Sequence, residues 1–176
     1  RGRLFSAGKK TWINGGLIGI ALFCGYWFQT WGLNYTTATK SAFITGLFVV
    51  LVPIIGQFFV QQKAGWQVWF GAFISILGLG FLIFSGNNLA PINIGDIITF
   101  FCAVSFALHI ILISKFTQPE NYVPILVIQI GVVALLSGLG ASIRGSVEFS
   151  PAVLPWKGII ITGLFATAFA FWAQNS

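Results

Sequence analysis

The stretch from Ser41 to Phe59 constrains the fold more than any other part of this chain, because it is apolar, uncharged and 19 residues long. A helix of that length can cross the hydrocarbon core of a bilayer, which is about 30 Å thick. Pro53 lies deep in this run and removes one backbone hydrogen bond. Helices that line a cavity tolerate such a gap, whereas helices that face lipid avoid it. We therefore predict a membrane-spanning helix that bends at Pro53.

The two faces of this predicted helix differ in the size of their side chains. One half of the helical wheel carries small and hydroxyl residues, namely Thr37, Ala38, Ser41, Ala42, Thr45 and Gly46. The other half carries bulky residues, namely Phe43, Ile44, Leu47, Val50, Leu51 and Ile54. Small side chains let helix backbones approach each other, and bulky ones suit lipid or a packed neighbour. The helix is therefore expected to pack closely on one side only.

The composition of the whole chain agrees with a membrane protein. Hydrophobic residues make up 57% of the 176 residues and charged residues only 7%, whereas a soluble domain carries roughly 25% charged residues. The formal net charge of +6 does not indicate nucleic-acid binding, because the sequence has no basic cluster with interleaved aromatic residues. Cys24 and Cys102 each lie inside an apolar run, where small buried thiols are expected to pack without pairing.

We predict an all-α membrane protein with six spans in the order of the apolar runs. They cover residues 12–33, 41–62, 66–84, 97–116, 123–143 and 157–175. Gly15 and Gly19 are spaced for close packing of the first span, as are Gly71, Gly78 and Gly80 for the third. The chain begins with Arg1, contains no Met and ends in or near a span, so we expect a piece of a longer protein.

Basic residues predict the orientation of the six spans. Alternation places Arg1, Arg3, Lys9, Lys10, Lys63 and Lys115 on one side of the membrane. The other side holds Lys40, Arg144 and Lys157. Because cytoplasmic loops carry the excess of Lys and Arg, the side with six basic residues is predicted to be cytoplasmic.

Several segments in consistent order resemble the drug/metabolite transporter superfamily, and specifically its EamA-like permeases. The clearest is TTATKSAFITGLFVVLVPIIG (36–56), which is similar to the family's fourth helix. The resemblance extends to residues 11–36 before it and to residues 71–86, 95–116 and 163–176 after it. One departure is the segment Val60–Gly65, which lacks the Gly-Glu step that many members carry.

The resemblance implies ten spans arranged as two inverted five-helix repeats. Residues 1–90 would then be the end of the first repeat and residues 91–176 the start of the second. One short internal match supports this division, because Tyr26-Trp27-Phe28-Gln29 and Phe171-Trp172-Ala173-Gln174 share an aromatic-Trp-x-Gln pattern. The two segments lie in spans of opposite predicted direction, as expected for an inverted repeat.

Gln29 and Gln174 are the leading candidates for substrate binding. An amide inside a membrane needs hydrogen-bond partners, so it should face the interior of the bundle. There it could bind a solute or could equally form a structural bond to another helix. Trp27 and Trp172 would line the same cavity, with core packing as the alternative role of each.

Three further residues are candidates for the same cavity. His109 is the one histidine of the chain and lies in the middle of a span; it could relay protons, or it could form a neutral bond to a neighbour such as Ser105. Ser41 and Thr45, with Thr37 nearby, could offer hydroxyl groups to a solute. Hydroxyl side chains in helices also bond commonly to their own backbone, which is the alternative for these residues.

We therefore predict a secondary transporter that moves a small organic metabolite or drug-like solute across a bacterial inner membrane by alternating access. The cavity residues carry no fixed charge, so the solute should be neutral or amphipathic. The sequence contains no catalytic or metal-binding motif and implies no enzyme activity, cofactor or metal. Its predicted partners are the solute and membrane lipid, and its oligomeric state stays open. The alternatives are a membrane sensor or assembly protein that does not transport, and an intramembrane enzyme whose catalytic residues lie elsewhere.

Overall fold

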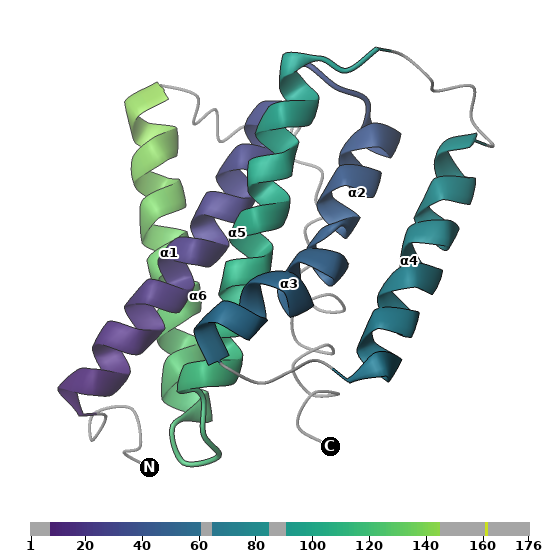
Figure 1. Ribbon diagram of the computed structural model, residues 1–176. Coiled ribbons are helices and arrows are strands. Elements are labelled where there is room, and N and C mark those ends of the chain that lie inside the picture. Colours follow the sequence, from purple (N-terminus) through teal and green to yellow (C-terminus); the bar gives the residue numbers. More distant parts are fainter. Residues whose placement is uncertain (1–7, 61–64, 85–90, 145–160, 162–176) are drawn as a thin grey trace. The chain divides into compact units, whose positions relative to one another are not determined.

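The computed structural model describes residues 8–60, 65–84, 91–144 and 161, and every regular element in them is an α-helix (Figure 1). The helices are α1 (Lys9–Gly32), α2 (Ala38–Gly46), α3 (Phe48–Val60), α4 (Trp66–Phe84), α5 (Ile94–Phe116) and α6 (Tyr122–Arg144). The chain divides into two compact units, residues 1–138 and 139–176. All contacts discussed below lie within the first unit.

The helical class of the chain is confirmed, but six spans are not shown. Within the described residues four segments are long and apolar enough to cross a membrane: Lys9–Gly32, Ala38–Phe59, Ile94–Phe116 and Tyr122–Ser142. The predicted third span contains a shorter apolar helix, Trp66–Gly78. The predicted sixth span, residues 157–175, lies outside the described residues apart from Ile161.

The predicted second span was expected to be one helix, but the structure divides it at Leu47. The amide of Leu47 donates to the carbonyl of Ile44 at 3.2 Å, and the amide of Val50 donates to the carbonyl of Leu47 at 3.0 Å. Both bonds join residues three apart instead of four, which marks a short departure from α-helical geometry. Gly46 directly precedes this turn and lowers the helix propensity there. Pro53 lies buried inside α3, and the bend expected at that residue stays a prediction.

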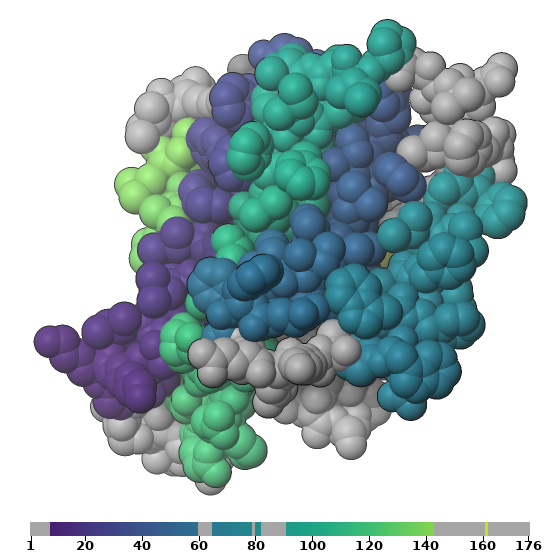
Figure 2. Space-filling model, in the orientation of Figure 1, coloured from purple at the N-terminus to yellow at the C-terminus, as the bar shows by residue number. Residues whose placement is uncertain are grey.

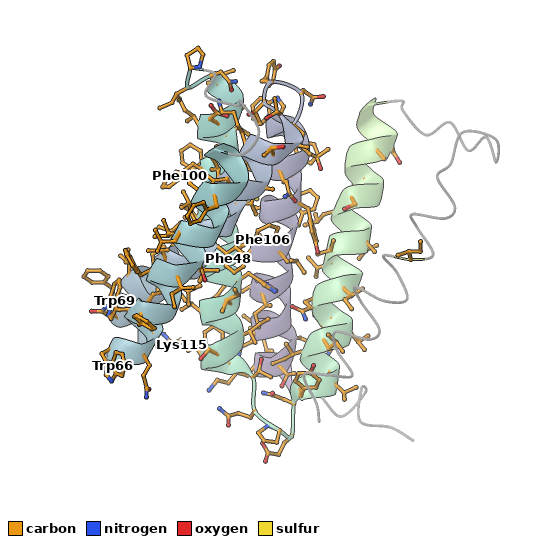
Figure 3. All side chains as sticks on the ribbon, turned by 90° about the vertical axis from the view of Figure 1, so that its right-hand side faces the viewer. Phe48, Trp66, Trp69, Phe100, Phe106 and Lys115 are labelled. Atoms are coloured by element: carbon orange, nitrogen blue, oxygen red, sulfur yellow. The ribbon has the colours of Figure 1, made fainter. Side chains whose placement is uncertain are left out.

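Helix α5 lies at the centre of the first unit. It contacts α1 on one side and both α2 and α3 on another, while α4 packs against α2 and α3 (Figure 1). Small buried residues, including Ala103 and Ala107, line α5 and allow neighbours on more than one face. Aromatic rings also pack between α5 and its neighbours. Phe48 and Phe106 face each other between α3 and α5, with ring centroids 6.4 Å apart (Figure 3).

Specific contacts fix the directions of these helices. Helix α1 runs antiparallel to α5, because Gly32 packs against Gly95 near one end and Ile18 contacts His109 farther along. Helices α2 and α3 run parallel to α5, as three successive contacts show: Lys40–Asp96, Thr45–Cys102 and Phe59–Lys115. We call the end where α2 and α5 begin the Lys40 end, and the end where α3 and α5 terminate the Lys115 end. These directions agree with the alternation predicted for the first, second and fourth spans.

The small residues of α1 make the close contact predicted for them, and the partner is α6. A Cβ atom at Gly15 would lie 2.9 Å from the Cβ of Ile128, and one at Gly19 would lie 2.8 Å from the Cβ of Val132. The order of these pairs shows that α1 and α6 run parallel, as spans of the same predicted direction should. Any larger residue at either glycine would therefore push the two helices apart.

The close packing predicted for Gly71, Gly78 and Gly80 is wrong in this structure. A Cβ atom at each of these positions would meet no atom of the described residues within 4 Å. Helix α4 contacts its neighbours through other residues, and the space-filling view shows it beside α3 on the face toward the reader (Figure 2). Glycine spacing indicates which helix face can approach a neighbour, but it does not require a neighbour to lie there.

Candidate functional site

Polar side chains from three helices meet in the interior of the first unit. Gln29 comes from α1, Ser41 and Thr45 come from α2, and Thr99 and Cys102 come from α5. We call this set of five residues the polar seam. Ser41, Thr99 and Cys102 are buried, and Gln29 and Thr45 are half-buried. The seam is therefore a row of uncharged polar groups inside an otherwise apolar bundle.

The middle of the seam is a chain of three side chains. The amide nitrogen Nε2 of Gln29 donates to the hydroxyl of Thr45 across 3.4 Å. That hydroxyl in turn lies 3.8 Å from the thiol of Cys102. Both distances are at the long end for hydrogen bonds of their kind. The contacts join α1, α2 and α5. Replacing them with hydrogen bonds to another molecule would cost little free energy.

The other two hydroxyls of the seam differ in how they are satisfied. Thr99 donates to the carbonyl of Gly95 at 2.7 Å, which is the local backbone bond common in helices. Ser41, only 2% exposed, has no hydrogen-bond partner for its Oγ atom among the described residues. A buried hydroxyl without a partner costs roughly 1–3 kcal/mol. Ser41 is therefore the residue of the seam whose hydroxyl most needs a hydrogen-bond partner from another molecule.

Close backbone contacts hold α1 and α5 together beside the seam. A Cβ atom at Gly95 would lie 2.7 Å from the carbonyl oxygen of Gly32 and 2.8 Å from the amide nitrogen of Thr36. Farther along, a Cβ atom at Gly25 would lie within 2.5–3.1 Å of three ring atoms of Phe106. Glycine is required at Gly95 because the opposing atoms are backbone and cannot rotate away.

A buried ion pair closes the Lys40 end of the seam. The Lys40 Nζ atom lies 2.5 Å from Oδ2 of Asp96, and both residues are buried. The hydroxyl of Thr36 donates to Oδ1 of the same carboxylate, and Lys40 also donates to the carbonyl of Pro91 at 3.2 Å. All of these groups lie where α2 and α5 begin.

The start of α5 positions the carboxylate in this pair. Asn93 and Asp96 form a capping box, in which the Asp96 amide donates to the Asn93 side chain at 3.1 Å and the Asn93 amide donates to Oδ2 at 3.0 Å. The negative charge also suits a helix N-terminus. The spacing of Asn93 and Asp96 was readable in the sequence as a helix start. The pairing with Lys40 was missed, because 56 residues separate the two partners.

His109 lies outside the seam, toward the Lys115 end of α5. Its Nδ1 atom is 3.2 Å from the carbonyl oxygen of Ile18, so Nδ1 carries the proton and donates it to this bond. The neutral partner considered from the sequence, Ser105, instead donates to the carbonyl of Phe101 at 2.9 Å. His109 therefore bonds to α1, and its described hydrogen bond goes to none of the other predicted site residues.

Gln129 on α6 is a buried amide that sequence reasoning missed. It is 3% exposed, and its Oε1 atom has no hydrogen-bond partner among the described residues. Its backbone lies against Gly19, where a Cβ atom would come within 3.0 Å of the Gln129 carbonyl. The signal was available, since this is the one amide within the apolar run that forms α6. Gln129 gives the interior a second polar position, on the α1–α6 contact.

The remaining predicted site residues do not lie together within the described part of the chain. Trp27 is 37% exposed and packs against Phe23, with ring centroids 5.7 Å apart. Gln174 and Trp172 lie outside the described residues. In the described part of the chain, no group of three His, Cys, Asp or Glu side chains is arranged to hold a metal ion.

A pocket lies between α1 and α6, and its lining is almost entirely apolar. It has a volume of about 430 Å³ and is lined by Trp12, Gly16, Val127, Ile128, Gly131, Val132 and Leu135. It offers no polar side chain to orient a ligand, apart from the indole of Trp12. The polar seam is therefore the better candidate for recognition of a specific solute.

Comparison with known proteins gives two kinds of match. Residues 1–84 match the model of the EamA-like transporter family. An uncharacterized transporter of Archaeoglobus fulgidus is 35% identical over 158 residues, which cover 90% of this chain and 50% of that protein. The uncharacterized transporter YdfC of Bacillus subtilis is 22% identical over 160 residues, or 86% of this chain and 51% of that protein. The chain thus spans about half the length of these curated relatives, and no solved structure matches it.

Proposed function

Because the chain belongs to the EamA-like transporter family, which is a family of transporters and not of enzymes, we propose that the protein is a secondary transporter for a small organic solute. It works by alternating access, so that a central site opens first to one side of the membrane and then to the other. The polar seam is the part of that site which this chain supplies.

The observation that carries this proposal is the unsatisfied polarity of the seam. Gln29, Thr45 and Cys102 form only long contacts with one another, and the buried Ser41 hydroxyl has no partner among the described residues. Purely structural interhelical bonds would be expected to be short and complete, since unpaired polar groups are costly in an apolar interior. A solute with hydrogen-bonding groups could replace the long contacts and satisfy Ser41.

The predicted division into two repeats would place the seam where a transport site lies in an inverted-repeat architecture. Helices α1 and α2 belong to the predicted first repeat and α5 to the predicted second, so the seam joins the two. In such transporters the substrate binds near the bilayer midplane between the repeats. We propose that Gln174 and Trp172 complete the site from the second repeat, opposite Gln29 and Trp27. His109 would then tie α5 to α1 beside the site without contacting the solute.

The charges around the seam favour a solute without net charge. The charged groups at its Lys40 end, Lys40 and Asp96, offset each other. The seam itself offers amide, hydroxyl and thiol groups but no group that could neutralise an ion. We therefore propose a neutral or zwitterionic metabolite, or an amphipathic drug-like molecule. The proposed location is the inner membrane of the cell, with the Lys115 end in the cytoplasm.

Reconstitution of the whole protein into liposomes tests this proposal. Solute counterflow should be measured with a panel that contains neutral, zwitterionic, anionic and cationic metabolites. We expect saturable counterflow for at least one neutral or zwitterionic solute. The 176-residue chain alone should give no flux above that of empty liposomes, because the relatives that it matches are about twice as long. Equal flux from this chain and from the whole protein would contradict the proposed two-repeat site.

A further inference from the structure

We propose that Lys40 and Asp96 form the gate that closes the Lys40 end of the polar seam, and that this pair separates each time the seam opens to that side of the membrane. The inference rests on the proposed function. The inference adds three things to the proposed function: the end at which the site opens, the direction of access, and two residues that had no assigned role in transport.

The geometry of the pair fits a closed gate. Lys40 and Asp96 connect the first turns of α2 and α5, which are the helices that carry the polar seam. The backbones of Gly32 and Gly95 meet beside the pair with no space for even a methyl group between them. The ion pair joins α2 to α5, and the backbone contact joins α1 to α5, so all three helices are tied together at this end.

The lysine contact at the opposite end is of a different kind, because Lys115 of α5 donates to the carbonyl of Phe59 of α3 at 3.4 Å and remains exposed to solvent. Lys115 lies at the end of α5 (Figure 3). The buried ion pair of Lys40 and Asp96, together with the Gly32–Gly95 backbone contact, is what identifies the Lys40 end as the closed one in this conformation.

An ion pair suits a contact that must break and re-form. A buried pair often gives no more stability than apolar residues of the same volume, because both charges lose their hydration. An apolar contact, however, would expose its surface to water on opening, whereas separated charges recover hydration. Lys40 also lies in the first turn of α2, where a positive charge is disfavoured by the helix dipole. The position of Lys40 is therefore better explained by a reversible contact than by helix stability.

Thr36 and Asn93 position the carboxylate for this contact. The Thr36 hydroxyl donates to Oδ1, and the Asn93 amide donates to Oδ2, so the carboxylate faces Lys40. Asn93 and Asp96 move together because they belong to one capping box on α5. Thr36 comes from the segment before α2 and would part from Asp96 when the gate opens. The gate thus has a lysine side, Thr36 and Lys40, and a carboxylate side, Asn93 and Asp96.

The natural thiol of Cys102 can report the opening of this gate. Cys102 is fully buried in the seam, so a thiol reagent reaches it only when the seam opens. The experiment uses the whole protein in permeabilised membranes, with every other cysteine replaced by serine. Lys40→Gln, Asp96→Asn and the double variant should each accelerate alkylation of Cys102, by roughly tenfold or more, because each breaks the same buried pair. Similar rates in the two single variants and the double variant are expected.

Two matched controls separate gating from general loosening. Lys115→Gln removes the lysine contact at the opposite end and should leave the Cys102 rate unchanged. In a second background that retains only Cys24, a half-buried thiol of α1 that is not part of the seam, Lys40→Gln should not change the alkylation rate. Unchanged Cys102 alkylation in folded Lys40→Gln and Asp96→Asn, or equal acceleration by Lys115→Gln, would overturn the proposal.

A milder variant keeps the test decisive if the charge variants do not fold. Thr36→Val retains both charges and removes one bond to the carboxylate, and it should accelerate Cys102 alkylation about two- to threefold. An unchanged rate in folded Thr36→Val would then overturn the gate. Alkylation needs no solute, so it is independent of the proposed function. Faster alkylation without any solute flux would support the gate and reject the transporter, whereas normal flux with unchanged alkylation would reject the gate alone.

Discussion

Most polar side chains in the interior of this protein have partners, and the exceptions are informative. His109 bonds to the carbonyl of Ile18, and Ser105 bonds to its own helix. Four residues each keep one buried atom without a partner among the described residues, namely Ser41, Thr117, Tyr122 and Gln129. Such atoms are costly in an apolar interior, so they indicate positions where another molecule or another helix completes the hydrogen bonding. Ser41 lies in the polar seam, and Gln129 lies on the α1–α6 contact.

Replacing Gln29 with leucine tests the seam at the scale of one residue. If Gln29 binds the solute, Gln29→Leu should weaken the apparent affinity for transport about two- to tenfold, which corresponds to the loss of one good hydrogen bond. Expression in the membrane should stay nearly normal, and Gln174→Leu should behave in the same way. The measurement is the concentration dependence of solute flux with the whole protein in liposomes.

The matched control for this substitution is Gln67→Leu, because Gln67 is exposed in the first turn of α4. It should leave the apparent affinity unchanged. If Gln29 has only a structural role, Gln29→Leu should lower the thermal stability and leave the affinity of the surviving protein as it was. That outcome would remove Gln29 from the proposed site.

Single residues also show which features of the site could be predicted from the sequence and which could not. The importance of Gln29 and Ser41 could be predicted, because an amide or hydroxyl in an apolar run needs a partner wherever the chain folds. The partners could not be predicted, because Gln29 and Thr45 are 16 residues apart and Lys40 and Asp96 are 56 apart. Lys40 and Asp96 each lie near the end of an apolar run, where a charge is expected at the membrane surface.

At the scale of helices, local sequence predicted the elements better than their continuity or their neighbours. The apolar runs and the glycines of α1 led to the observed helices and to the close contact of Gly15 and Gly19. The turn at Leu47 was not predicted, since it depends on bonds between residues three apart that compete with ordinary helical bonds. The glycines of α4 were predicted to pack closely as those of α1 do, but a Cβ atom at each would meet no atom of the described residues within 4 Å.

Two glycine substitutions test the packing of these helices. Gly95→Ala should destabilise the folded protein by about 1–3 kcal/mol, because the added methyl group meets the backbone of Gly32 and Thr36. Gly71→Ala should have no cost and could add up to about 1 kcal/mol, because it meets open space and alanine is the better helix former. Thermal unfolding of the whole protein in lipid nanodiscs measures both. Equal melting temperatures for the two variants would contradict the described contact of α1 with α5.

At the scale of the whole molecule, the helix directions and the charges give one orientation. The contacts of α5 with α1 and with α2 and α3 fix which helix ends share a side. Counting basic residues gave six on one side and three on the other. Because cytoplasmic loops carry the excess of Lys and Arg, this count predicts that the Lys115 end is cytoplasmic.

Cysteine labelling on intact cells tests this orientation. Asn34→Cys lies after α1 at the Lys40 end, and Glu120→Cys lies between α5 and α6 at the Lys115 end; both positions are exposed. In a background with serine at the other cysteine positions, a membrane-impermeant reagent should label Asn34→Cys only. Disruption of the cells should make Glu120→Cys reactive as well. Labelling of Glu120→Cys alone on intact cells would invert the orientation.

The most direct test of the central claim is whether the transported solute protects the seam. The whole protein is prepared with Cys102 as its single cysteine, and alkylation of this thiol is followed while the concentration of a solute found by counterflow is increased. If the polar seam binds the solute, alkylation should slow, and the concentration for half-maximal protection should match that for half-maximal transport. A solute of the panel that is not transported should give no protection. Saturating transport with unchanged alkylation of Cys102 would show that the solute crosses the membrane elsewhere.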